Sequence, residues 1–159
     1  MNKSILYTCL FALPYLFGCS SNSDKNAKND ETAITAAAVI SENCFVAVDE
    51  LDSAKLNYKI LSDGKVTGTL VINYLEKGKN DGKIEGKFKG DTLFVHYTFK
   101  IGTQNPTVYK NPLALLKQDS TMILGVGQIE TYLGQSRFVA GKPIRFDRSR
   151  FTFTPVSCK

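Results

Sequence analysis

The stretch GKIEGKFKGDTLFVHYTFKI, residues 82–101, decides the fold. In its first half, glycine or an apolar residue alternates with a charged residue. In its second half, apolar residues from Leu93 to Ile101 alternate with polar ones, and Phe94 breaks the alternation. A period of two is typical of a strand that buries one face. Because Gly90 and Asp91 between the halves favour a tight turn, the stretch predicts a hairpin of two antiparallel strands.

The same pattern continues on both sides of this hairpin. Residues 65–74 alternate in the same way, and turn-forming residues at Asp63-Gly64 and Asn80-Asp81-Gly82 separate the alternating runs. Further strands are expected over residues 45–48, 55–61, 113–116, 122–128 and 151–156. Pro106 and Pro112 predict a loop or a sheet edge, because proline cannot donate a backbone hydrogen bond.

These patterns predict an all-β fold of about eight short antiparallel strands, with no long amphipathic helix. Such strands cover their apolar faces by closing into a barrel or by stacking. We predict a small up-and-down barrel, closed or partly open, with a β-sandwich as the alternative. Glycines within the expected strands favour the barrel because they allow sharp bends; they are Gly68, Gly86, Gly125 and Gly127. For residues 129–150 a loop, a short helix and an added strand all remain open.

The amino-terminal residues differ from the rest of the chain. Residues 1–18 contain one cation, Lys3, followed by a mostly apolar run from Ile5 to Phe17. The run is shorter than the roughly twenty residues that a membrane-spanning helix needs, so it is interpreted as a signal peptide. Residues 19–43 are polar and then alanine-rich, which predicts a flexible tether. Residues 44–159 then form the single β domain.

The tetrapeptide Leu16-Phe17-Gly18-Cys19 resembles the lipobox of bacterial lipoproteins. The resemblance implies cleavage before Cys19, acylation of its thiol and attachment to a membrane through covalent lipid. It also implies the bacterial cell envelope as the location; the outer membrane is expected, and both a periplasmic and a surface-exposed position remain open. Residues 76–99, EKGKNDGKIEGKFKGDTLFVHYTF, are similar to uncharacterised lipoproteins of Bacteroidetes, which implies hairpin geometry and no reaction.

The four cysteines divide into two groups. Cys9 leaves with the signal peptide and Cys19 is the expected lipid acceptor, so Cys44 and Cys158 remain in the β domain. In an oxidising compartment such a pair is expected to form a disulfide.

The chain is basic, with 20 Lys and Arg against 15 Asp and Glu. A basic surface favours an anionic envelope polymer as partner, and a protein partner remains the alternative. Nucleic acid is not expected, because the chain is expected to be exported. The candidate anion-binding residues are Lys83 and Lys87 on one strand face, and Arg145, Arg148 and Arg150 in the run RFDRSRF. Ordinary solubilising charge is the competing interpretation for both groups.

Catalytic and metal-binding patterns are weak. His96 is the one histidine of the chain and lies on the outward phase of its strand, so a histidine-based triad or a multi-histidine metal site is not expected. Asp49, Glu50 and Asp52 are interpreted as a solvated turn rather than a calcium site. We therefore expect no enzyme activity, no metal and no cofactor.

Two hypotheses of function follow, and an enzyme on this scaffold is the third. The first is a lipid-anchored, non-catalytic binding or envelope-maintenance module. The second is a calycin-like barrel that holds a small apolar ligand inside. Its lining would come from the aromatic residues Tyr58, Phe88, Tyr97 and Phe99.

Overall fold

The computed structural model describes residues 37–158, which form ten strands. Their bounds are β1 (Val39–Asp49), β2 (Asp52–Leu61), β3 (Lys65–Tyr74), β4 (Gly78–Lys89), β5 (Thr92–Ile101), β6 (Tyr109–Gln118), β7 (Thr121–Leu124), β8 (Ile129–Tyr132), β9 (Gln135–Phe138) and β10 (Thr152–Val156). Within this range no helix is long and apolar enough to cross a lipid bilayer. Residues 1–18 and Cys19, and with them the expected signal peptide and lipid acceptor, lie outside the described residues.

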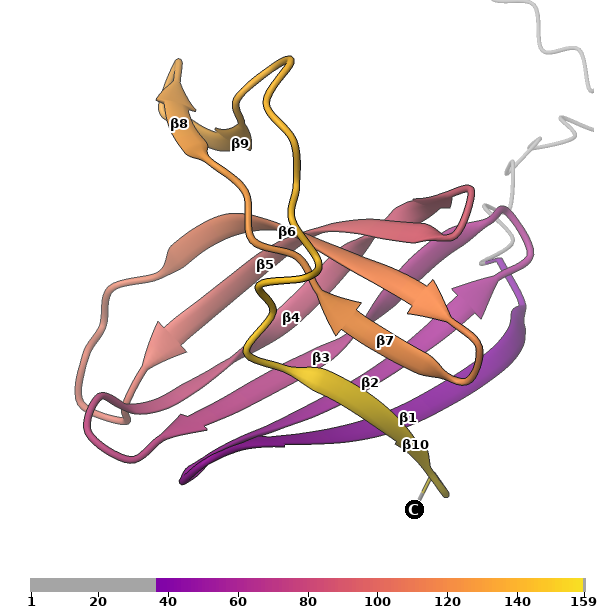
Figure 1. The fold of residues 1–159 in the computed structure, drawn as a ribbon, viewed down its shortest axis with the longest axis horizontal. Coiled ribbons are helices and arrows are strands. Elements are labelled where there is room, and N and C mark those ends of the chain that lie inside the picture. Colours follow the sequence, from indigo (N-terminus) through magenta and orange to yellow (C-terminus); the bar gives the residue numbers. More distant parts are fainter. Residues whose placement is uncertain (1–36, 159) are drawn as a thin grey trace, which may run out of the picture. The chain divides into compact units, whose positions relative to one another are not determined.

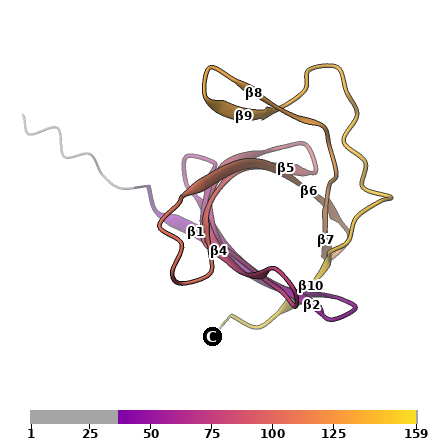
Figure 2. The same ribbon diagram turned by 90° about the vertical axis from the view of Figure 1, so that its left-hand side faces the viewer.

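Eight of these strands close into a barrel in the order β1-β10-β7-β6-β5-β4-β3-β2 (Figures 1 and 2). All neighbours are antiparallel, and β1 to β7 follow one another around the wall. After an excursion, β10 returns between β7 and β1 and completes the ring. The predicted all-β barrel of about eight antiparallel strands is therefore confirmed, and the sandwich alternative is not what forms.

Residues 125–150, which we call the arm, make this excursion. They contain the hairpin β8–β9, which stands off the barrel wall in Figure 2. The two limbs of the arm are joined near its base, where Val126 and Arg145 exchange two backbone hydrogen bonds of 2.8 Å. Of the three possibilities left open for this part of the chain, it forms a loop with added strands.

The two ends of the barrel differ in what builds them. The entry end holds the start of β1 and the turns β2–β3, β4–β5 and β6–β7, and the far end holds the turns β1–β2, β3–β4 and β5–β6. At the entry end the disulfide Cys44–Cys158 joins β1 to the residues after β10, as predicted from the cysteine count. The first strand begins at Val39, five residues before Cys44, so it includes residues expected in the tether.

Side chains of the inward phase fill the middle of the barrel. Leu56, Leu70, Ile84, Leu93 and Phe153 are completely buried there. Neighbouring strands approach closely where Gly68 lies opposite Tyr58 and Gly86 lies opposite Val95. A β-carbon at either glycine would collide with backbone atoms of the neighbouring strand, so only glycine permits this close approach.

Two details of the expected pattern are wrong. Asn80 and Gly82 do not form a turn but pair inside β4, because the chain reverses earlier, at Gly78 with a φ of +78°. The strand expected over 122–128 ends at Leu124, and its last glycines instead make room for arm side chains.

Pro112 lies inside β6 opposite His96 and is buried, but β7 pairs only with residues 115–118, so Pro112 lies at an edge of the sheet, as expected. The carbonyl of Ala114 accepts a hydrogen bond from Gly125 on the side away from β5. The backbone of Pro112, two residues earlier, faces the same side. The N–H that proline lacks is thus not needed for pairing with β5, and the strand continues through it.

Candidate binding site

The four predicted lining residues are all on the inward phase, but they do not line one cavity. Tyr97 and Phe99 stack on each other with ring centroids 4.5 Å apart, and Phe99 stacks further on Tyr109. The Tyr97 hydroxyl donates a 2.9 Å hydrogen bond to the carbonyl of Leu70, so this pair belongs to the packed core. Tyr58 and Phe88 lie at the entry end instead, beside a hollow.

The hollow at the entry end, which we call the mouth, has a volume of about 560 Å³. Its apolar residues include Phe45, Tyr58, Ile60, Phe88 and Met122. Its polar residues include Ser41, Asn43, Asp91, Lys117, Asp119, Ser120 and Thr121. The mouth therefore combines an apolar floor with a rim that can donate and accept hydrogen bonds and that carries charges of both signs.

The floor of the mouth is a group of three aromatic rings. Phe45 and Tyr58 are nearly parallel, with centroids 5.8 Å apart, and Phe88 meets Tyr58 edge-on at 6.2 Å. Tyr58 is only 4% exposed, and none of the hydrogen bonds within residues 37–158 involves its hydroxyl. Solvent nevertheless reaches this hydroxyl. Because Tyr58 is on the inward phase and borders the mouth, the hydroxyl faces the mouth.

The protonation of this hydroxyl follows from its surroundings. Burial raises the pKa of Tyr58, since the low-polarity interior disfavours the phenolate. The hydroxyl therefore stays protonated at neutral pH and can donate a hydrogen bond to a bound molecule.

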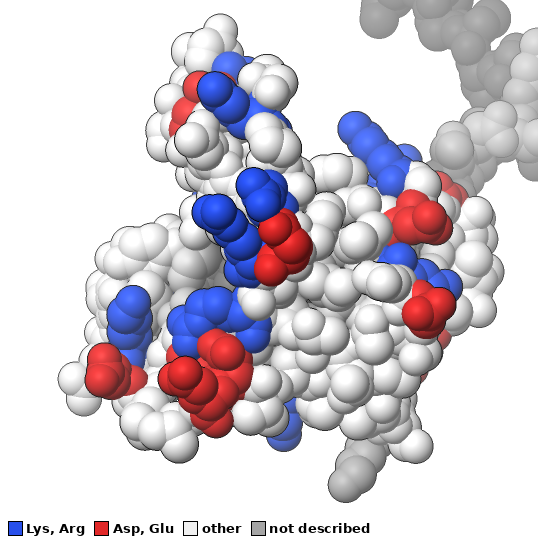
Figure 3. All heavy atoms as spheres, in the orientation of Figure 1, with Lys and Arg blue, Asp and Glu red and all other residues white. Residues whose placement is uncertain are grey.

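The five predicted anion-binding residues lie in three separate settings. Lys83 and Lys87 are exposed on the outer face of β4, Arg145 and Arg148 lie on the arm, and Arg150 reaches the far end of the barrel. The surface in Figure 3 shows the same dispersal, with Lys and Arg along the arm and over the barrel, many of them beside Asp or Glu. These residues form no single basic site.

The lysines of β4 differ in their neighbours. Lys83 lies opposite Thr69 and Thr98. Lys87 lies opposite Lys65, which forms an ion pair with Asp63. Lys87 also borders a hollow of about 380 Å³ between the wall and Phe138 of the arm.

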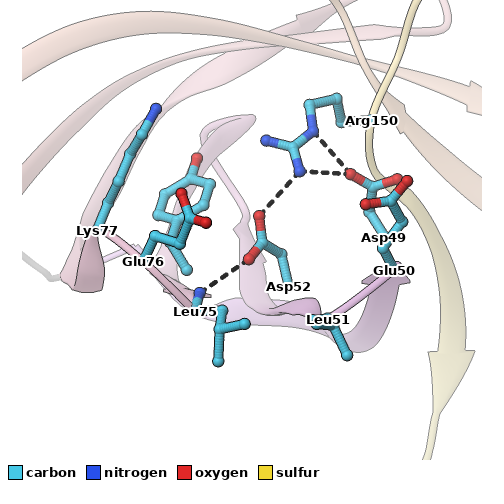
Figure 4. A pocket seen from close by; sticks show the side chains of 9 residues that line it. Asp49, Glu50, Leu51, Asp52, Leu75, Glu76, Lys77 and Arg150 are labelled. Atoms are coloured by element: carbon cyan, nitrogen blue, oxygen red, sulfur yellow. Dashed lines mark hydrogen bonds and ion pairs between the residues drawn. The ribbon is translucent and has the colours of Figure 1, made fainter.

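Two of the three arginines are held by carboxylates of the chain itself. Arg145 makes two hydrogen bonds, of 2.9 and 2.7 Å, with Asp147. At the far end, Arg150 bonds Asp49 at 2.7 Å and Asp52 at 2.8 Å (Figure 4). Asp49 and Asp52 are thus not a simple solvated turn, because they fix the end of the arm to the β1–β2 turn.

Asp52 is the centre of this far-end group. Its other oxygen accepts a 2.9 Å hydrogen bond from the backbone N–H of Leu75 (Figure 4). That bond and the Arg150 guanidinium together hold the pKa of Asp52 below its ordinary value. In the hollow here, about 270 Å³, Asp49, Asp52 and Arg150 bind one another, so we regard these three residues as a structural clamp. Glu50, Glu76 and Lys77 also border the hollow and form no ion pair with a described residue.

Sequence reasoning missed Phe45 and Met122 in the floor and the whole rim of the mouth. Phe45 directly follows Cys44 in an expected strand, and its inward phase could have indicated it. Met122 and the rim come from β7 and from turns that only closure of the barrel brings together, so no local pattern indicates them.

Comparison of the chain with protein-family models, curated proteins and solved structures found no match. Within residues 37–158 no group of three or more His, Cys, Asp or Glu side chains is arranged to hold a metal ion. His96 is exposed on the outer wall, at the edge of the hollow under the arm.

Proposed function

We propose that this chain is a lipid-anchored, non-catalytic binding protein of the bacterial cell envelope. The anchor rests on the lipobox-like sequence that ends at Cys19. The Cys44–Cys158 disulfide supports an oxidising location outside the cytoplasm. The chain enters β1 at the same end of the barrel as the mouth, so the proposed binding site lies beside the proposed tether.

One observation supports the binding role: the Tyr58 hydroxyl, on a residue that is only 4% exposed, opens on an aromatic-floored hollow and has no partner among the described residues. Solvent can reach this hydroxyl, and a ligand acceptor in the hollow would take the place of water as its partner. The ligand class is a small molecule with an apolar body for Phe45, Tyr58 and Phe88 and with an acceptor that reaches the hydroxyl. An anionic polymer is less well supported, because Arg145 and Arg150 already have carboxylate partners.

The anchor is tested in a bacterium that processes lipoproteins. Mass spectrometry of the purified protein should find a mature terminus at Cys19 that carries acyl chains. The Cys19→Ala variant should retain residues 1–18 and carry no lipid, because the acceptor thiol is gone. Normal cleavage of that variant, or a mature terminus at another residue, would refute the anchor.

The mouth is tested with 8-anilinonaphthalene-1-sulfonate, which joins an apolar ring system to a sulfonate acceptor. All strands and core residues lie within residues 39–156, so a chain from Ser20 to Lys159 contains the whole barrel. Titration should show saturable binding to this chain. Phe88→Ala should weaken it about tenfold through lost apolar contact, and Tyr58→Phe about threefold through the lost hydrogen bond.

The matched control is Tyr132→Phe, which removes a tyrosine hydroxyl from the arm, outside the mouth. It should bind the dye as the unaltered chain does. Thermal unfolding accompanies each variant, because the dye also binds partly unfolded protein. If all folded variants bind the dye equally, the mouth is not the binding site and this part of the proposal is wrong.

A further inference from the structure

The tip of the arm carries a leucine in a position that disfavours leucine. The strands β8 and β9 pair up to Tyr132 and Gln135, so the turn between them consists of Leu133 and Gly134. Both have positive φ, +49° and +76°, as in a type I′ turn. Such turns favour asparagine followed by glycine, because a β-carbon is unfavourable at positive φ and a branched apolar side chain gains nothing there.

Packing does not explain this leucine. Leu133 is 86% exposed, and its neighbour Tyr132 is 54% exposed. Ile129, at the start of β8, is also exposed. The tip thus presents apolar side chains to solvent at a cost in backbone conformation, which points to a contact outside the barrel.

One guanidinium lies beside this apolar tip. The guanidinium of Arg137 lies 4.0 Å from the centre of the Tyr132 ring and forms an ion pair with Glu130. Along the whole arm, five basic residues stand against two acidic ones, and of the five, Arg145 is paired with Asp147 and Arg150 with Asp49 and Asp52 of the barrel. Arg148 and Lys142 are exposed there, and neither has an ion-pair partner within residues 37–158.

We infer that the arm tip is a membrane-contact element, in which Leu133 and Tyr132 enter the interface of an anionic bilayer while the cations of the arm meet its headgroups. Tyrosine is suited to that interface because its ring is apolar and its hydroxyl is polar. Anionic headgroups complement Lys142 and Arg148, the two cations of the arm that form no ion pair with a described residue.

The size of the tip favours a membrane over a protein partner. A specific protein interface buries about 800 Å² on each partner, and the few exposed apolar side chains of one turn supply much less. Shallow insertion into a bilayer interface needs only a few such residues together with basic neighbours. The inference does not depend on the acyl anchor; where the anchor is present, the tip is a second contact that sets which side of the barrel faces the membrane.

The test uses the chain from Ser20 to Lys159, which has no lipid, so its outcome is independent of the anchor. The chain contains no tryptophan, so Leu133→Trp introduces a single fluorescent reporter at the tip. With vesicles of phosphatidylcholine and phosphatidylglycerol, its emission should shift to the blue and become protected from a soluble quencher. Leu75→Trp, at a 68% exposed leucine of the far-end turn, is the matched control and should show neither change.

A second variant separates membrane contact from folding. Leu133→Asn suits the type I′ turn, so its thermal midpoint should be equal to or above that of the unaltered chain. Its partitioning to the anionic vesicles should nevertheless fall about tenfold, through loss of the buried leucine. Leu75→Asn should leave partitioning unchanged.

Three outcomes would overturn the inference. One is vesicle binding without a blue shift, which would mean electrostatic adsorption only. Another is an equal loss of partitioning in Leu133→Asn and Leu75→Asn. The third is a complete lack of binding to anionic vesicles. The exposed tip would then be interpreted as a contact surface for another protein.

Discussion

Tyr97 shows how one side chain ties together two strands that are not neighbours, β5 and β3. Its ring is buried against Phe99, and its hydroxyl bonds the Leu70 carbonyl on a different strand. Tyr97→Phe keeps the ring but leaves that carbonyl without its donor. We expect a loss of about 1–2 kcal/mol in the free energy of unfolding, measured by urea denaturation. Tyr109→Phe, at a partly exposed ring, is the control and should change stability little; a similar loss in both would argue against the specific role of the bond.

Asp52 makes the stability of the far end depend on pH. Its pKa is lower in the folded chain than the ordinary value of 3.8, first through the Leu75 N–H and then through Arg150. A lowered carboxyl pKa stabilises the fold fully above 3.8, and this contribution is lost as the pH falls below 3.8 through the folded pKa. The thermal midpoint of Asp52→Asn should thus lie below that of the unaltered chain at pH 7, and the difference should shrink as the pH falls below 3.8.

The control for this pH series is Asp91→Asn, because Asp91 makes no ion pair with any described residue. Its midpoint should follow the unaltered chain across the series. If Asp52→Asn keeps a constant difference from pH 7 to pH 3, the charge of Asp52 is not what stabilises the clamp.

At the scale of elements, close approach of β2 and β3 depends on Gly68. A β-carbon there would collide with the carbonyl oxygen of Asn57 and with backbone atoms of Tyr58. Gly68→Ala should therefore cost about 2–4 kcal/mol in the free energy of unfolding, because the neighbouring backbone must move. Thr69→Ala, on the outward phase next to it, should cost little, and equal effects in the two variants would contradict the packing argument.

The elements themselves were predictable to different degrees. Alternation located β3 and β5 because each buries one face, so the period of two is visible in the residues. The hairpin β8–β9 gave no such signal, since most of its residues are exposed and its turn contains Leu133 where a typical turn has asparagine. The opposite error occurred at Asn80-Asp81-Gly82. These residues are typical of turns and led to the prediction of a turn, but they lie inside a paired strand.

At the scale of the whole molecule, the barrel was predictable and the sites were only partly so. The mouth needs Phe45 from β1, Phe88 from β4 and Met122 from β7, and the clamp joins Arg150 to Asp49 across 101 positions of sequence. Such contacts form only when the barrel closes, and no periodic pattern in the local sequence indicates them. The cysteine pair was predictable over a similar distance because elimination left one partner for each residue.

Closure of the barrel depends on its narrowest seam, which the disulfide reinforces. β10 aligns with β7 over two residues and with β1 over three, whereas β6 and β7 share four and the remaining neighbours share eight or more, as β2 and β3 do. Cys44 and Cys158, 114 residues apart, join the two sides of the β1–β10 edge of this seam.

Replacing both cysteines by alanine should lower the free energy of unfolding by about 4 kcal/mol, since the unfolded chain is no longer constrained. Urea denaturation of the unaltered chain in dithiothreitol provides the control, because reduction breaks the same bond without a substitution. The reduced chain and the double variant should unfold at the same urea concentration; equal stability of the oxidised and reduced chains would show that the short strands alone hold the seam.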